Sequence, residues 1–157
     1  APQQTAAWEA LKREERQGRG EAGVLAGVAR TLPALTRSAK LGKRARAVGF
    51  DWPDARGIRD KVDEEFAEFE ATLAEGESLE RQTEELGDLL FTIANWGRLL
   101  GLDPEAALRA TNAKFERRFG FIETQAAAQG LDLKGLSAEQ WEAFWQQAKS
   151  AERGKAG

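Results

Sequence analysis

The sequence lacks three residue types that often supply catalytic or metal-binding chemistry: its 157 residues include no cysteine, no histidine and no methionine. Without cysteine and histidine, the chain cannot form disulfides, the usual zinc sites, or the Cys–His and Ser–His pairs of nucleophilic catalysis. Any bound metal must therefore be held by oxygen ligands, which suits Mg²⁺ or Mn²⁺. Because even an initiator methionine is missing, we expect a chain that is processed, trimmed or part of something longer.

Long uncharged runs and an excess of positive charge are absent as well. The uncharged runs are too short to span a membrane, and no signal peptide is visible, so we expect a cytoplasmic protein. A formal net charge of −3 argues against a general nucleic-acid-binding surface. A chain of this length can form one domain with a substantial core.

No stretch alternates polar and apolar residues over a useful length, so we expect no β-sheet and an all-α fold class. Apolar periodicity and helix-end signals predict helices at about residues 5–17, 32–48, 55–74, 79–100, 104–129 and 137–151. We expect residues 1–30 to form a helix and a linker or arm, residues 31–152 the main domain, and residues 153–157 a tail.

Two acidic pairs lie on consecutive predicted helices. Glu65 with Glu68, and Glu85 with Asp88, are each spaced i, i+3, which puts both carboxylates of a pair on one helix face. A turn at residues 74–78 would join the two helices in antiparallel fashion and bring the pairs together. Four negative charges at one point repel unless a cation lies among them, so we expect a divalent-metal site. The alternative is a solvated acidic face.

Residues 86–100 are apolar nearly all round, and only Asp88 and Arg98 among them are charged. Such a helix is expected to be buried, and a carboxylate on it needs a partner or a metal. One small subunit cannot cover this helix, so we expect a symmetric dimer that completes a four-helix core. On the preceding helix, Glu65 flanks an apolar stripe that we expect to face the core, and Lys61 lies just beyond it. The stripe consists of Ile58, Val62, Phe66, Phe69 and Leu73.

Cationic residues mark the predicted helix at residues 104–129. Lys114 and Arg118 share a face at i, i+4, with Arg117 beside them, and such a face suits phosphate oxygens. The alternative is an exposed basic face paired with Glu116 or Glu123.

Aromatic residues gather at two places. Phe50 and Trp52, in a turn, form either a hydrophobic plug, which composition favours, or a wall for a flat ligand. Trp141, Phe144 and Trp145 lie on the last predicted helix, where such a set usually packs.

Five short segments of the sequence occur together in an order that is typical of a known protein family. The segments concerned are LPAL at 32–35, VGFDW at 48–52, EEFAE at 64–68, ELGD at 85–88 and NAKFERRF at 112–119. With them, the chain resembles the MazG nucleoside triphosphate pyrophosphohydrolases from about residue 8 to residue 149, with the family pattern EExxE followed by ExxD. The opening segment is similar to the linker between the halves of full-length MazG proteins, which implies the second, catalytic half of a tandem protein.

The resemblance implies an all-α homodimer that hydrolyses NTPs or dNTPs to the monophosphate and pyrophosphate with Mg²⁺, in nucleotide-pool house-cleaning. It implies metal ligation by the four acidic residues. Because no histidine or cysteine is available, one of the glutamates, Glu65 or Glu68, must serve as general base if a side chain does so at all. The resemblance also implies a set of residues that bind substrate, and the cations among them could instead order the acidic cluster. These residues are Lys61, Lys114, Arg117, Arg118, Trp145 and Trp52.

Other functions stay open. Within the enzyme class, a narrow dUTPase-like specificity is an alternative. Outside it, the chain could be a non-catalytic helical interaction module that binds a protein partner or a structural cation. An oxidising di-iron bundle is disfavoured because its Glu-x-x-His pairs need histidine.

Overall fold

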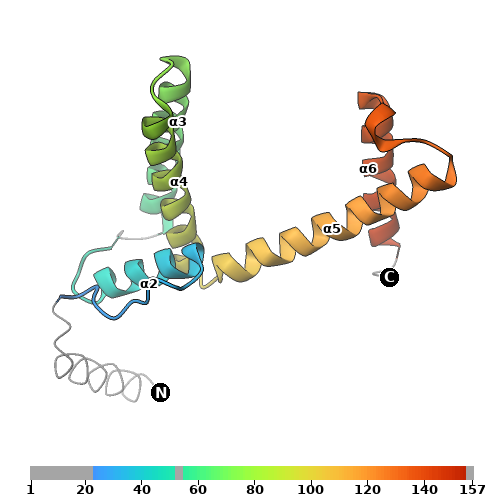
Figure 1. Cartoon of the computed structure of the whole chain (residues 1–157). Coiled ribbons are helices and arrows are strands. Elements are labelled where there is room, and N and C mark those ends of the chain that lie inside the picture. The colour runs from blue at the N-terminus through green and yellow to red at the C-terminus, as the bar shows by residue number, and fades with distance from the viewer. Residues whose placement is uncertain (1–22, 52–54, 155–157) are drawn as a thin grey trace. The chain divides into compact units, whose positions relative to one another are not determined.

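The computed structural model describes residues 23–51 and 55–154, and every regular element in these ranges is helical (Figure 1). The all-α prediction is therefore confirmed. The predicted helix at residues 5–17 and the aromatic Trp52 lie outside the described residues. The elements are α2 (Ala34–Arg46), α3 (Ala55–Ala74), α4 (Leu79–Leu99), α5 (Pro104–Ala128), the 3-10 helix η1 (Leu133–Gly135) and α6 (Ala138–Arg153).

The helix ends follow local chemistry. Ser78 caps α4 by accepting a hydrogen bond from the Arg81 backbone N–H at 3.3 Å. Ser137 and Gln140 form a reciprocal capping box at the start of α6. Gly101 follows α4 with a φ of +75°, a conformation in which a residue with a Cβ is strained. These signals explain why the predicted helices agree with the observed ones to within about two residues.

The chain divides into two compact units, Ala1–Glu105 and Ala106–Gly157, and each is described by itself. In the first unit, α3 and α4 run side by side in opposite directions and form a hairpin (Figure 1). The seam of this hairpin includes Ile58 of the predicted apolar stripe but not the whole stripe. The buried residues of α3 include Ile58, Glu65 and Thr72, which recur every seven residues, whereas Phe66 and Leu73 are 50% and 52% exposed.

The stripe prediction was therefore wrong for Phe66 and Leu73, for a geometric reason. Each follows a seam residue by one position, which rotates its side chain by about 100° around the helix axis. In α4, the exposed residues Leu86, Leu90 and Ile93 likewise follow the buried residues at 85, 89 and 92. Because the two helices are antiparallel, positions one step beyond the seam project to the same side of the hairpin. We call these five exposed residues the hairpin apolar face.

Helix α2 packs against α4 through a polar contact. Asn95 is fully buried, and its Nδ2 donates to the Ser38 carbonyl oxygen at 3.4 Å. Arg98 Nε donates to Asn95 Oδ1 at 2.9 Å, and its Nη2 donates to Asp51 Oδ1 at 2.8 Å. Gly42 permits this approach, since a Cβ there would lie 1.8 Å from Asn95 Oδ1. Arg98, the one cation among residues 86–100, thus has a carboxylate partner whose side chain is only 11% exposed.

The second unit has a small core between α5 and α6. Its buried members are Ile122, Ala126, Phe144 and Ala148, and partly buried aromatic and leucine side chains surround them. The packing of Phe144 agrees with the expectation that the aromatics of the last helix pack. Among the described residues, no helix is long and apolar enough to cross a bilayer.

Candidate functional site

Three of the four predicted carboxylates meet at the seam of the α3–α4 hairpin. Glu65, Glu68 and Glu85 each offer one oxygen, and these oxygens lie within 4.8 Å of one another. Glu65 and Glu85 are buried because they occupy seam positions, whereas Glu68 is exposed. We call these three residues the acidic cluster. Asp88 is exposed and lies outside the group of three, so it stays a predicted ligand.

Lys61 neutralises one side of the acidic cluster. Its Nζ lies 2.8 Å from Glu65 Oε1 and 3.0 Å from Glu64 Oε1. The hydrogen bond to Glu65, followed by the one to Glu64, raises the pKa of the Lys61 ammonium above its ordinary value. Of the two roles that the sequence suggested for Lys61, phosphate contact or ordering of the carboxylates, the structure displays the ordering contact.

Arg81 neutralises the other side, and the sequence analysis did not single it out. Its guanidinium pairs with Glu85 and donates to Glu84 Oε2 at 2.8 Å. The hydrogen bond to Glu84, followed by the charge of Glu85, raises the pKa of Arg81. The i, i+4 spacing of Arg81 and Glu85 was the available signal, because such pairs share a helix face.

The acidic cluster suits a hard divalent cation. All three donors are carboxylate oxygens, which Mg²⁺ and Mn²⁺ prefer. The three oxygens lie within 4.8 Å of one another, so side-chain adjustment would let them hold one small divalent ion together. Two partly exposed cations now balance two buried carboxylates, and an incoming metal ion would share or take over that role.

Apart from Lys61, the predicted phosphate-binding cations belong to the second unit. Lys114 is exposed on α5, while Arg118 Nε donates to Glu152 Oε2 on α6 at 2.7 Å. Arg117 Nε lies 3.4 Å from Glu152 Oε1. The hydrogen bond from Arg118 lowers the pKa of the Glu152 carboxyl. Sequence reasoning missed Glu152, because nothing in local spacing indicates a contact across 34 residues.

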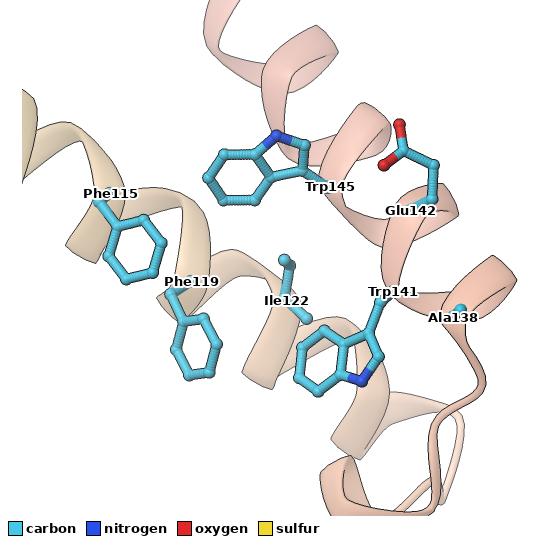
Figure 2. Close-up of a pocket in the computed structure, with 7 residues that line it drawn as sticks. All are labelled: Phe115, Phe119, Ile122, Ala138, Trp141, Glu142 and Trp145. Atoms are coloured by element: carbon cyan, nitrogen blue, oxygen red, sulfur yellow. The ribbon is translucent and has the colours of Figure 1, made fainter. Parts of the chain in front are cut away.

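An aromatic pocket of about 470 Å³ opens between α5 and α6 (Figure 2). Trp141 and Trp145 point from α6 toward Phe115 and Phe119 on α5, with ring centroids 5.9 to 6.1 Å apart. The Arg118 guanidinium lies over the Trp145 ring at 5.5 Å. The lining is completed by Ile122, Ala138 and Glu142.

Phe50, the turn aromatic that the structure describes, does not form the expected plug. Phe50 is 79% exposed within the described residues, so the plug interpretation is wrong for this residue. The side chain of its neighbour Asp51 is only 11% exposed, because Arg98 and Arg46 hold its carboxylate. The predicted role of Trp52 stays a prediction.

Known proteins share the segment that carries the acidic cluster. A family model described as phosphoribosyl-ATP pyrophosphohydrolase matches residues 43–115. The chain is 44% identical over 149 residues to the nucleoside triphosphate pyrophosphohydrolase of Escherichia coli K12, covering 94% of this chain and 56% of that protein. It is 36% identical over 145 residues to the nucleoside triphosphate pyrophosphohydrolase/pyrophosphatase MazG of Thermotoga maritima, covering 92% of this chain and 55% of that protein.

Protein YabN of Bacillus subtilis is 42% identical over 146 residues, which cover 93% of this chain and 30% of that protein. The chain thus spans about half the length of these two pyrophosphohydrolases. It spans 30% of the length of YabN. The resemblance to the MazG nucleoside triphosphate pyrophosphohydrolases that the sequence motifs indicated is confirmed.

Proposed function

We propose that this MazG-like chain hydrolyses nucleoside triphosphates, ribo or deoxy, to the monophosphate and pyrophosphate with Mg²⁺, and so removes unwanted nucleotides from the cellular pool. One observation carries the proposal. The acidic cluster Glu65, Glu68 and Glu85 lies at the hairpin seam, inside the segment that matches a pyrophosphohydrolase family model.

In this proposal the acidic cluster, with Asp88, holds Mg²⁺ or Mn²⁺. A bound divalent ion supplies a Lewis acid for phosphate oxygens and lowers the pKa of water. The chain itself must supply the base, and Glu65 or Glu68 can accept the proton of the attacking water because no histidine or cysteine is present. The ion pair of Lys61 with Glu65 orients that carboxylate.

Cations must hold the triphosphate, which carries its own negative charge. We assign this role to Lys114 and Arg118, with Arg117 as a peripheral contact. These groups stabilise the charge that develops on the pyrophosphate leaving group. The exposure of Lys114 and the ordered guanidinium of Arg118 support the assignment.

The nucleobase needs a flat apolar surface, and the pocket beside Trp145 supplies one. Four aromatic rings border it, and a base could stack there with a gain of about 1–3 kcal/mol. Trp52 is a second proposed contact.

We also propose a homodimer. The hairpin apolar face leaves five large side chains at least 41% exposed on one side of the α3–α4 hairpin. A second copy would bury the same face through a two-fold axis and complete the four-helix core.

A nucleotide panel tests this function. Canonical and modified NTPs and dNTPs are incubated with Mg²⁺, and the products are resolved as monophosphate, diphosphate, pyrophosphate or phosphate. The expected result is metal-dependent release of pyrophosphate from several nucleotides. Hydrolysis of dUTP alone would favour the narrow dUTPase-like alternative. Failure to hydrolyse any nucleotide with Mg²⁺ or Mn²⁺ would refute the enzyme proposal and leave a helical interaction module.

A further inference from the structure

We propose that Glu152 is a positioning residue that orients Arg118 for its contact with the triphosphate. This inference rests on the proposed function, because it takes the role of Arg118 from there. It adds a residue that no sequence motif indicated, and it assigns α6 a part in the reaction beyond packing.

Two contacts of different kinds constrain the Arg118 guanidinium. The Trp145 ring lies 5.5 Å from the guanidinium carbon and limits the space open to the group, while Glu152 Oε2 accepts from Nε at 2.7 Å and fixes one edge of it. The arginine side chain is only 19% exposed, although it ends in a charge. An arginine held in one geometry loses less rotamer freedom when it binds substrate, which strengthens binding and alignment.

Glu152 contacts the Nε edge of the Arg118 guanidinium, and the choice of edge decides which N–H groups remain for a phosphate. An arginine binds a carboxylate or phosphate through a fork of two parallel N–H groups. Glu152 accepts from Nε, so it does not consume the pair formed by the two terminal nitrogens of Arg118. The terminal pair of N–H groups is the fork that this contact leaves for a phosphate. A carboxylate on the terminal nitrogens would instead compete with the substrate.

Arg117 shares the same carboxylate but is held less firmly. Its Nε is 3.4 Å from Glu152 Oε1, and its side chain is 64% exposed. An ion pair at such exposure contributes little. The direction of the Glu152 pKa, lowered chiefly by the hydrogen bond from Arg118, agrees with an ionised carboxylate whose main partner is Arg118.

A purely structural clamp between α5 and α6 is the competing explanation. A clamp would affect stability alone, so its loss would lower the melting temperature and leave kcat/KM of the folded enzyme unchanged. A positioning residue acts through Arg118, so its contribution to catalysis must vanish when Arg118 is removed.

The experiment is a double-mutant cycle measured by steady-state hydrolysis of a dNTP with Mg²⁺. We expect Glu152→Ala to lower kcat/KM roughly ten- to hundredfold. Glu152→Gln keeps an acceptor without the charge, so its kcat/KM should lie between those of the wild type and Glu152→Ala. In the Arg118→Ala background, Glu152→Ala should cause no further loss. Glu123→Ala, which removes an exposed carboxylate from α5, is the matched control and should leave kcat/KM unchanged.

Thermal melts of all variants separate folding from positioning. Equal losses of kcat/KM with and without Arg118, or a Glu152→Ala variant that melts lower yet keeps wild-type kinetics when folded, would overturn the positioning role. An active wild type with an unimpaired Glu152→Ala variant refutes only this inference. An inactive wild type refutes the proposed function, and the role of Glu152 with it.

Discussion

At the scale of single residues, the chain places charge where a helix hairpin normally buries apolar side chains. Glu65 and Glu85 lie on the α3–α4 seam, and burial of an ionised carboxylate is unfavourable without a partner. Lys61 and Arg81 supply partners one helical turn away on the same helices. Two apolar residues could fill these seam positions without any such compensation, so we interpret the arrangement as serving a ligand rather than stability.

The first prediction concerns Glu68, the exposed member of the acidic cluster. Glu68→Ala should lower Mg²⁺-dependent hydrolysis by about 100-fold or more, because ligand loss weakens metal binding and misplaces the ion. The metal-free variant should melt at the wild-type temperature or slightly above it, since removal of one carboxylate relieves like-charge repulsion. Activity assays and thermal melts with and without Mg²⁺ measure both effects.

Glu70→Ala supplies the control, because Glu70 is an exposed carboxylate on the same helix outside the cluster. Wild type and control should gain melting temperature with Mg²⁺, whereas the Glu68 variant should gain less. A Glu68→Ala protein with normal hydrolysis and normal stabilisation by Mg²⁺ would exclude this residue as a ligand.

The second prediction concerns Trp145, which borders the aromatic pocket and is partly buried against the core of its unit. If a base stacks on it, Trp145→Ala should weaken nucleotide binding by about 1–3 kcal/mol without a matching loss of Mg²⁺ affinity. Trp145→Phe keeps a ring and should retain part of the affinity. Calorimetric titration with a non-hydrolysable analogue, beside melts of the free proteins, provides the measurement. A variant that melts much lower but binds the analogue as tightly as wild type would identify Trp145 as core alone.

At the scale of elements, the packing of α2 on α4 depends on close approach rather than on apolar area. Gly42 is buried against Asn95, which is itself fully buried and hydrogen-bonded to both helices. The network continues through Arg98 to Asp51, so it also anchors the turn that follows α2. A buried polar network of this kind is sensitive to small displacements, because each unpaired group costs free energy.

The third prediction follows from this contact. Gly42→Ala should destabilise the protein by about 1–3 kcal/mol, because the added methyl group overlaps Asn95 and forces the helices apart. Gly120→Ala is the control, since Gly120 is helical and a Cβ there meets no atom within 4 Å. This control should be neutral or stabilising by up to about 1 kcal/mol. Chemical denaturation of both variants provides the comparison, and equal stabilities would contradict the predicted overlap.

At the scale of the whole molecule, the hairpin apolar face leaves five large apolar side chains exposed to solvent in a single copy of the chain. Helix α4 was expected to be buried nearly all round, yet Leu86, Leu90 and Ile93 are 41 to 47% exposed in one copy. Each leucine or isoleucine gains about 1.5–3 kcal/mol when fully buried, so covering this face would be strongly favourable. A second copy has the complementary surface by symmetry.

The fourth prediction tests this assembly. The protein should be a dimer at micromolar concentration, and Ile93→Asp should dissociate it, because the new charge would be buried without a partner in the dimer. Thr83→Asp, at an exposed position on the same helix, should remain dimeric. Light scattering gives the mass and circular dichroism the helix content of each variant. A stable, folded wild-type monomer would refute the dimer.

Local signals in the sequence predicted where the helices begin and end, and they predicted the acidic cluster. Ser78, Gly101 and the capping pair Ser137 and Gln140 act within a few residues, so they mark helix ends without tertiary information. The i, i+3 spacing of Glu65 and Glu68, with a turn leading to Glu85, is likewise local enough to predict the acidic cluster.

Only the tertiary structure decided which side of each helix forms the seam. Phe66 and Leu73 of the predicted stripe lie one position beyond the seam, and which position is buried depends on how two helices dock rather than on either sequence alone. The same holds for the contact of Arg118 with Glu152 and of Arg98 with Asp51. These pairs join residues on separate elements, where charge makes many partners possible and only packing brings one of them within hydrogen-bonding distance.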